Sequence, residues 1–333
     1  MIPHHYFRYA ALAIAAAIGF AGCSSVTDNP ATTGTITITQ KMLPQIDSNA
    51  VYQLWFSYPK TSAQSKNPHF DHGDASYVSV GRFTVAADGS LIGLDGKPAA
   101  FTFPSSLTPG LVADVILTVE PKVKTDTLPG ARLISGTFTG TPSLGTATLV
   151  LSGDDAFGDA MGTIGTGYAV LETPTTTADA DFASGIWFVK PDGTTMAPGL
   201  TLPVLPISDE NPLWHYEAWV VTGSGSSQQY TKLGSFLDPA QADSDGAGPQ
   251  AGPNTSSAFA YPGQDLITGS TSVALNDGAH GVAVSLEPDG IVTNRPTAVL
   301  LSAGTIPAAT ARLQAFPLPA NAGLPTMSIS FTR

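Results

Sequence analysis

The chain has 333 residues, a formal net charge of −12 and only 12% charged residues. Such an acidic chain disfavours nucleic acid and anionic lipid headgroups as partners, because both are bound by basic patches. Its 34 glycines and 27 prolines favour many short strands joined by turns, and no long amphipathic helix is visible in the pattern.

The first 22 residues have the pattern of an export signal. Arg8 precedes an apolar run from Ala10 to Phe20, which is shorter than the ~20 apolar residues that a membrane-spanning helix needs. Small residues then close the segment. One interpretation is an ordinary secretory signal peptide that is cleaved near Ala21.

The other interpretation is a lipoprotein signal, and it rests on Cys23. This residue is the only cysteine of the chain, and it ends the sequence Phe-Ala-Gly-Cys, which resembles a bacterial lipobox with Phe20 in place of the usual leucine. Cleavage before Cys23 would leave a thiol and an amine for acylation, and two or more chains such as palmitate make a stable membrane anchor. An aspartate after the cysteine tends to retain such proteins at the inner membrane, so Ser24 favours the outer membrane. We predict a lipid-anchored protein of the cell envelope whose mature part has no disulfide and no thiol chemistry.

Strand patterns begin after a short polar tether, residues 23–34. Residues 35–39, Thr-Ile-Thr-Ile-Thr, alternate apolar and polar side chains, which is the period of a half-buried strand. Residues 327–331, Met-Ser-Ile-Ser-Phe, alternate in the same way. The sequence therefore predicts a strand at each end of the mature chain.

An internal repeat connects two parts of the sequence. A Tyr-x-x-Trp pattern, a Gly-x-Phe pattern and an apolar run ending in Glu-Pro occur in the same order twice. The first copy has Tyr52, Trp55, Gly81, Phe83, Glu120 and Pro121, and the second has Tyr216, Trp219, Gly234, Phe236, Glu287 and Pro288. Each pattern alone is weak, but their order is hard to obtain by chance. We expect these residues to hold equivalent structural positions.

The repeat defines the fold class that the sequence predicts. We expect an all-β protein with two tandem modules of the Ig-like or β-sandwich type, which arose by internal duplication. The modules would span residues 35–160 and 161–333, after a signal peptide at residues 1–22. A glycine-rich stretch at residues 158–167 would link them.

The repeated pattern resembles the extracytoplasmic C-terminal domain of anti-sigma-K factors. Both copies carry it, and it covers the larger part of the mature chain. The resemblance implies an outward-facing β module with a regulatory and structural role. Anti-sigma-K factors bind their sigma factor through a cytoplasmic N-terminal domain and cross the membrane once, whereas a lipoprotein signal stands in that place here. Direct sigma-factor binding is therefore not expected.

One candidate metal site lies in an insertion that the second copy lacks. His69, Asp71, His72 and Asp74 place two imidazoles and two carboxylates in one short segment, and such groups can hold a divalent transition metal. The alternative is an ordinary polar turn, because spacing within a loop does not fix coordination geometry. The sequence favours the turn.

A second candidate lies after the Gly-x-Phe pattern of the second copy. The segment from Asp238 to Gly246 contains Asp243 and Asp245, and it resembles the opening of a calcium-binding loop, in which alternate carboxylates surround a hard cation. It lacks the distant glutamate of the helix-loop-helix form. The sequence favours an acidic hairpin tip, since Asp and Gly are also common turn residues.

No catalytic constellation is indicated. The chain has no Gly-x-Ser-x-Gly pattern, and Glu120 and Glu287 occupy equivalent positions, which favours a shared structural role over an acid and base pair. The sequence thus predicts a protein that is not an enzyme and that binds or scaffolds an envelope partner. It predicts no cofactor, and a bound divalent cation is the alternative. A regulatory partner in sigma-factor signalling and a metal-dependent hydrolase using residues 69–74 are the alternatives.

Overall fold

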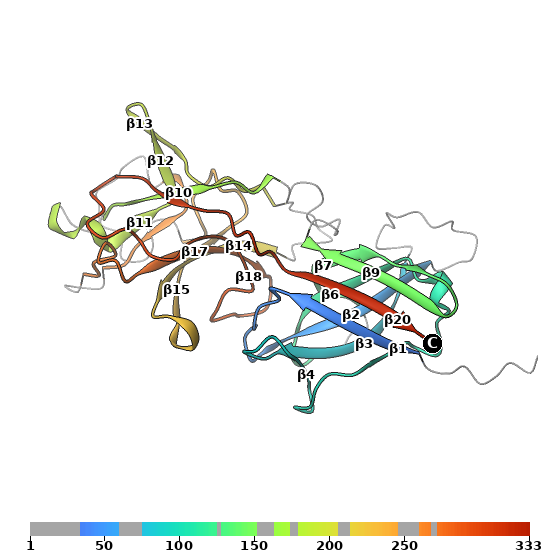
Figure 1. The fold of residues 1–333 in the computed structure, drawn as a ribbon. Coiled ribbons are helices and arrows are strands. Elements are labelled where there is room, and N and C mark those ends of the chain that lie inside the picture. The colour runs from blue at the N-terminus through green and yellow to red at the C-terminus, as the bar shows by residue number, and fades with distance from the viewer. Residues whose placement is uncertain are drawn as a thin grey trace, which may run out of the picture. The chain divides into compact units, whose positions relative to one another are not determined.

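The computed structural model describes residues 34–59, 75–124, 128–151, 163–173, 179–205, 214–245, 260–267 and 272–333. The chain divides into two compact units, residues 1–32 and 33–333, and every described residue belongs to the second unit. The described residues form twenty strands in antiparallel sheets and only short 3₁₀ segments, so the predicted all-β fold is confirmed (Figure 1). None of these described segments is a helix of the length and apolar character that crossing a membrane requires.

The largest sheet has ten strands in the order β4-β3-β2-β6-β7-β9-β20-β1-β5, with β8 paired to β9. Its strands are β1 (Thr35–Lys41), β2 (Ala50–Pro59), β3 (Ala75–Val85), β4 (Leu91–Gly93), β5 (Phe101–Thr102), β6 (Asp114–Pro121), β7 (Ala131–Thr137), β8 (Thr139–Gly140), β9 (Leu144–Val150) and β20 (Thr326–Thr332). The 3₁₀ segment η1 (Pro109–Leu111) precedes β6. The side-chain amide of Gln40 on β1 donates a 2.8 Å hydrogen bond to the carbonyl oxygen of Gly89, in the turn from β3 to β4. The sheet therefore curls, so that strands near its two ends approach each other.

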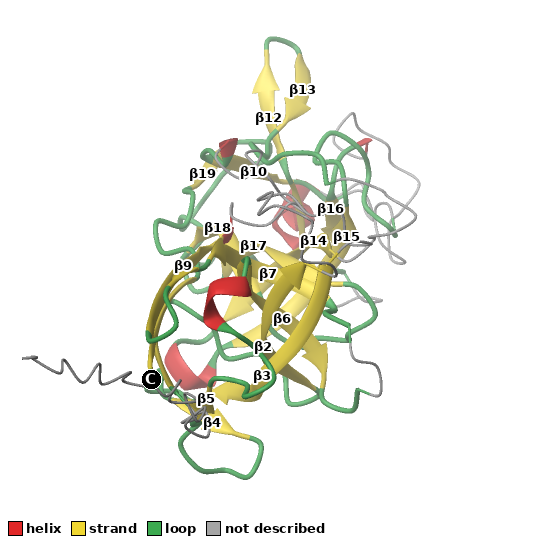
Figure 2. Cartoon of the chain, turned by 90° about the vertical axis from the view of Figure 1, so that its right-hand side faces the viewer, coloured by secondary structure: helices red, strands yellow, loops and turns green. Residues whose placement is uncertain are grey.

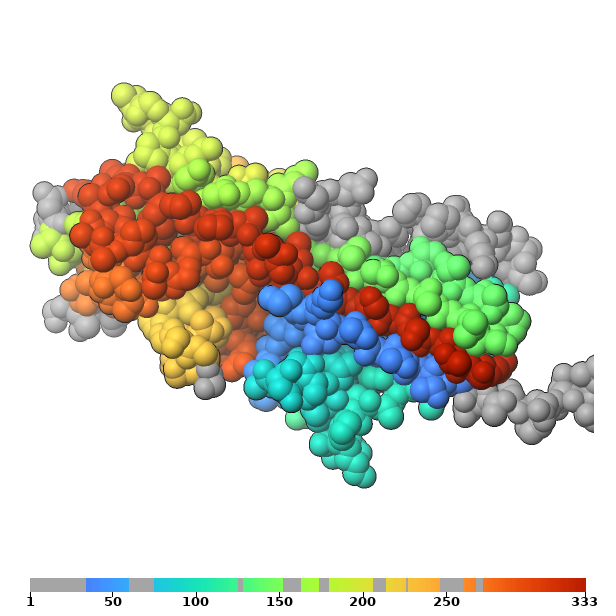
Figure 3. Space-filling model, viewed as in Figure 1, coloured from blue at the N-terminus to red at the C-terminus, as the bar shows by residue number. Residues whose placement is uncertain are grey.

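The C-terminal strand lies inside this sheet, between β1 and β9. Ile36 is opposite Phe331 on one side of β20, and Ala147 is opposite Ile329 on the other. Figure 3 shows the red end of the chain between the blue β1 and the green β9. Both terminal segments are strands, as their alternation predicts, and they are direct neighbours. The last strand of residues 161–333 thus belongs to the sheet of residues 35–160.

The remaining described strands form three smaller sheets. One has the order β15-β14-β17-β18, another the order β16-β11-β10-β19, and β12 pairs with β13 alone. The strands are β10 (Gly167–Leu171), β11 (Gly185–Trp187), β12 (Val189–Asp192), β13 (Thr195–Pro198), β14 (Trp214–Thr222), β15 (Gln229–Phe236), β16 (Gly263–Asp265), β17 (Gly281–Pro288), β18 (Ala298–Ala303) and β19 (Phe316–Leu318), with 3₁₀ segments η4 (Asp179–Ser184) and η5 (Gly225–Ser227). Figure 2 shows the β12–β13 ribbon extending away from its neighbours.

Two groups of four strands match in order and register. They are β3-β2-β6-β7 in the large sheet and β15-β14-β17-β18. Tyr52 is opposite Phe83 and Val119, and Tyr216 is opposite Phe236 and Leu286. Both groups also have register shifts at the same two places, beside the tryptophan of the central strand and two residues before the Glu of its neighbour. The boundary expected near residue 160 falls in residues 152–162, outside the described residues.

The core follows from the side-chain alternation of the strands. On β2, Tyr52, Leu54 and Phe56 are fully buried on one face, and burying a large apolar side chain contributes roughly 1.5–3 kcal/mol. Phe103 bridges β2 and the C-terminal strand, since its ring centroid lies 5.1 Å from that of Phe56 and 4.4 Å from that of Phe331. The apolar cluster continues through strands of both four-stranded sheets. One large core therefore runs through most of the described strands, and Val170, Trp187 and Val189 form a second, smaller cluster.

Candidate functional site

The repeated tyrosines anchor the chain segments that precede their strands. The Tyr52 hydroxyl donates a 2.9 Å hydrogen bond to the carbonyl oxygen of Pro44, and the Tyr216 hydroxyl donates a 2.8 Å bond to that of Pro203. Burial raises the pKa of both hydroxyls above the ordinary value, so they stay protonated donors. The signal missed in the sequence is the Leu-Pro pair before each tyrosine, at residues 43–44 and 202–203, because its distance to the tyrosine differs between the copies.

Each repeated tryptophan begins a buried chain of hydrogen bonds that ends at the repeated glutamate. The Trp55 indole donates to the Thr118 hydroxyl at 3.0 Å, and that hydroxyl donates to Glu120 Oε1 at 2.6 Å. In the second group, Trp219 donates to Ser285 at 2.7 Å and Ser285 donates to Glu287 at 2.5 Å. A hydroxyl two residues before each glutamate is visible in the sequence, but only the strand pairing brings the tryptophan to it.

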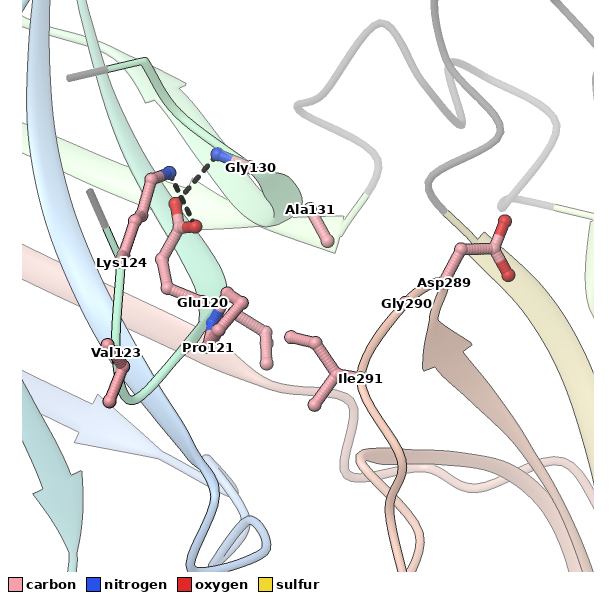
Figure 4. Close-up of a pocket in the computed structure, with 10 residues that line it drawn as sticks. Glu120, Pro121, Val123, Lys124, Gly130, Ala131, Asp289, Gly290 and Ile291 are labelled. Carbon is pink, nitrogen blue, oxygen red and sulfur yellow. Dashed lines mark hydrogen bonds and ion pairs between the residues drawn. The ribbon is translucent and has the colours of Figure 1, made fainter. Parts of the chain in front are cut away.

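The two buried glutamates differ in what satisfies their remaining lone pairs. Glu120 accepts hydrogen bonds from the Gly130 amide at 2.7 Å and from the Lys124 ammonium at 2.6 Å (Figure 4). Glu120 and Lys124 thus form a buried ion pair. A Cβ at Gly130 would overlap the Glu120 carboxylate, so a glycine is required there. Because the carboxylate is enclosed by its own chain, the geometry gives Glu120 a structural role.

Glu287 has hydroxyls in the place of the lysine. It accepts the Thr297 amide at 2.7 Å, the Thr297 hydroxyl at 2.7 Å and the Thr293 hydroxyl at 2.9 Å. Ile291 stands four residues after Glu287, where the first copy has Lys124 four residues after its glutamate. Burial raises the pKa of Glu287, although the hydrogen bonds from Ser285, Thr297 and Thr293 oppose the rise.

A lysine lies over each repeated tryptophan, but it comes from a different place in each copy. The ammonium of Lys124, after β6, is 5.4 Å from the centroid of Trp55, and that of Lys232, on β15, is 5.1 Å from the centroid of Trp219. Lys232 also donates to Glu217 at 3.1 Å. Such cation–π contacts stabilise by about 0.5–2 kcal/mol each. One face of each tryptophan ring is therefore already covered by a lysine of the same chain.

A pocket of about 310 Å³ lies where the turns after β6 and β17 approach each other. It is lined by Glu120, Lys124 and Val123 on one side and by Asp289 and Ile291 on the other, and in Figure 4 the Asp289 carboxylate points away from Glu120. The charged groups of Glu120 and Lys124 bond to each other, and the exposed lining of the pocket is polar and apolar in about equal parts.

Hydrogen bonds fix the second side of this pocket. The Asn294 amide and side chain both donate to the Asp47 carboxylate at 3.0 Å, and the Asn49 side chain donates to the carbonyl oxygen of Val292 at 2.8 Å. Val123 is 86% exposed and Val292 is 70% exposed. The pocket thus has a defined position. Val123 and the partly buried Ile291 line it, and the exposed Val292 follows Ile291 in the chain; these three residues are called the pocket rim below.

His215 and Asp289 form a pair that sequence reasoning did not bring together. His215 Nδ1 lies 2.5 Å from Asp289 Oδ1, on neighbouring strand ends of β14 and β17. The antiparallel register causes the contact, because His215 is opposite Glu287 and Asp289 follows two residues later. An imidazole oriented by a carboxylate can act as a base, but among the described residues no serine or cysteine side chain is bonded to it.

Asp243 and Asp245 converge on Gly234. A Cβ at Gly234 would lie 2.7 Å from Asp243 Oδ2 and 2.9 Å from Asp245 Oδ1. Burial raises the pKa of Asp243 to about 8; the hydrogen bond from the Gly263 amide opposes the rise, and the nearby Asp245 charge adds to it. Of the candidate metal ligands, these two are brought together.

The other sequence-predicted residues lie outside the described residues. They are Cys23 at the anchor and His69, Asp71, His72 and Asp74 in the insertion. Within the described ranges, no group of three or more His, Cys, Asp or Glu side chains is arranged to hold a metal ion.

Comparison with known proteins gives no relative. No protein-family model, no curated protein and no solved structure matches this chain.

Proposed function

We propose that the chain is a lipid-anchored protein of the bacterial envelope, attached through Cys23, that binds or scaffolds an envelope partner and is not an enzyme. The single observation that supports this best is the use of the repeated polar residues. The polar atoms of Trp55, Glu120 and their counterparts in the second copy form hydrogen bonds with their own group of strands and the turns that adjoin it. What the two copies share therefore serves the framework, and we infer that they arose by duplication.

The pocket rim is the binding surface that we propose for this partner. Val123 and Val292 are among the most exposed large apolar side chains of the described residues, and Val123 and Ile291 line the pocket. An apolar rim around a fixed hollow is typical of a surface that another molecule covers.

The anchor and the surface can be tested in the bacterium that makes the protein. Cys23→Ala should abolish incorporation of labelled palmitate and release the protein from the membrane fraction. A photo-crosslinking amino acid at Val123 or Val292 should then give the same single adduct in the wild-type background and lose it in the Cys23→Ala background.

Matched control positions are Leu94 and Leu144, which are 52% and 60% exposed and do not line the pocket. Equal adducts at all four positions would contradict the proposed surface. Retention of palmitate by the Cys23→Ala variant would contradict the proposed anchor.

A further inference from the structure

The segment after β15 folds back along that strand and presents two carboxylates to the same side. The Ser244 amide donates to the carbonyl oxygen of Ser235 at 2.8 Å, and the two serine hydroxyls bond to each other at 3.0 Å. Asp243 and Asp245, on either side of Ser244 in this turn, both direct a carboxylate oxygen toward Gly234 on β15. The fold itself therefore pairs these two carboxylates.

Gly234 provides the space for this pair. Its φ of +113° belongs to glycine, and any side chain at this position would collide with both carboxylates. Asp243 Oδ2 and Asp245 Oδ1 lie 2.7 Å and 2.9 Å from the position that a Cβ of Gly234 would take, so the two carboxylates are close to each other. Two negative charges at this distance repel each other unless a positive charge or a proton lies between them.

Asp243 supplies an independent sign that a partner belongs here. Its side chain is 9% exposed, and one carboxylate oxygen, Oδ2, accepts the Gly263 amide at 2.9 Å. The other oxygen, Oδ1, is buried and has no hydrogen-bond donor. No lysine or arginine within the described ranges forms an ion pair with either aspartate. A buried carboxylate oxygen without any partner is costly, so a ligand is expected.

We propose that Asp243 and Asp245 together bind a calcium ion. The donors are oxygens only, which suits a hard cation, and none of the described residues brings an imidazole or thiolate to them that would favour zinc or copper. Calcium accepts an irregular ligand set completed by water, whereas magnesium requires a near-ideal octahedron. Two carboxylates without a further acidic ligand place the affinity in the weak class of extracellular calcium modules, with Kd of about 10⁻⁴–10⁻³ M.

Trp187 gives this site a direct optical test. It is opposite Gly263 in the register of β11 and β16, and Gly263 is the residue that donates to Asp243. A terbium ion bound at Asp243 and Asp245 would lie near this indole and emit when tryptophan is excited. The full chain should therefore show sensitised terbium emission that calcium displaces at concentrations of about 0.1–1 mM or above.

The variant that decides the question is Asp245→Asn, because Asp245 is exposed and its replacement leaves the buried Asp243 in place. We expect it to weaken terbium and calcium binding at least tenfold and to abolish the rise in melting temperature that calcium gives the wild type. Asp238→Asn is the matched control: its carboxylate only accepts the Ala240 amide in the preceding turn, and binding should be unchanged.

Two results would overturn the proposal. If terbium emission and its displacement by calcium are the same in Asp245→Asn as in the wild type, the cation is bound elsewhere. If calcium has no effect on the wild type, and Asp245→Asn melts at a higher temperature than the wild type in a chelator, the two carboxyl groups share a proton instead.

Discussion

Glu120 and Glu287 show how one buried carboxylate can be satisfied in two ways. Both accept a backbone amide ten residues further along the chain. Glu120 then requires a cation from Lys124 and a glycine that makes room for it, whereas Glu287 is enclosed by threonine hydroxyls. The sequence indicates the equivalence of the two glutamates. It does not indicate these partners, because the residues that differ between copies look like ordinary loop variation.

The lysine of the first copy should contribute strongly to stability. Lys124→Met leaves the Glu120 carboxylate buried without its cation, which costs about 3–5 kcal/mol in comparable buried pairs. Lys232→Met is the matched control, since that lysine is also over a tryptophan and bonded to a glutamate, but its side chain is 43% exposed. We expect it to cost about 1 kcal/mol or less. Urea unfolding measures both losses, and equal losses would show that the buried pair is no stronger than the exposed one.

Glu287 should make stability depend on pH. Because burial raises its pKa, the folded protein keeps a proton that the unfolded chain has already lost. The contribution to the free energy of unfolding is therefore full below pH 4.5, the ordinary value, and it is lost as the pH rises through the raised pKa. Glu287→Gln cannot ionise and should be less sensitive to pH across this window. Urea unfolding from pH 4 upward compares the two proteins, and parallel curves would refute the assignment.

At the scale of strands, the two four-stranded groups agree in more than their motifs. Strand order, cross-strand register and both register shifts coincide. A bulge bends and twists its strand, so we expect register shifts at the same positions to act alike on the two groups of strands. The lysines over Trp55 and Trp219 come from different elements. Only the tertiary structure reveals that both rings are covered, because Lys232 reaches Trp219 through strand pairing and Lys124 reaches Trp55 from the turn after β6.

Alternation predicts which residues are strands and which side faces the core, but it does not choose a neighbouring strand. This explains why the sequence predicts β1 and β20 as strands and does not predict that they pair with each other. The same limit applies to Asp243 and Asp245, whose spacing resembles a calcium loop. Their convergence over Gly234 depends on the Ser235–Ser244 contact, which no local pattern encodes.

At the scale of the whole molecule, the large sheet needs both ends of the chain. β20 is the only strand between β9 and β1 in its order, so a fragment ending near residue 151 lacks a central strand of its own sheet. We expect residues 34–151 to be unfolded or aggregated. The same fragment with residues 326–333 attached through a flexible linker should unfold cooperatively in urea, monitored by circular dichroism.

A suitable control for this experiment is a linked peptide in which Ile329 and Phe331 are replaced by serine. It restores the length of the strand but not its buried side chains, and it should not rescue folding. Cooperative unfolding of the bare fragment would mean that the first sheet is complete without the C-terminal strand.

The sequence by itself determined the class of the fold, the equivalence of the two sets of repeated residues and the strands at both ends, because these follow from local periodicity and turn chemistry. It also carries the prediction of the anchor at Cys23, which stays a prediction. Only the tertiary structure decided that β20 completes the first sheet, that Lys124 and the threonines satisfy the two glutamates, and that two aspartates meet over a glycine. The pairing of β20 with β9 joins segments far apart in the chain. The other contacts depend on the conformation of the turns after β6, β15 and β17, which local periodicity does not encode.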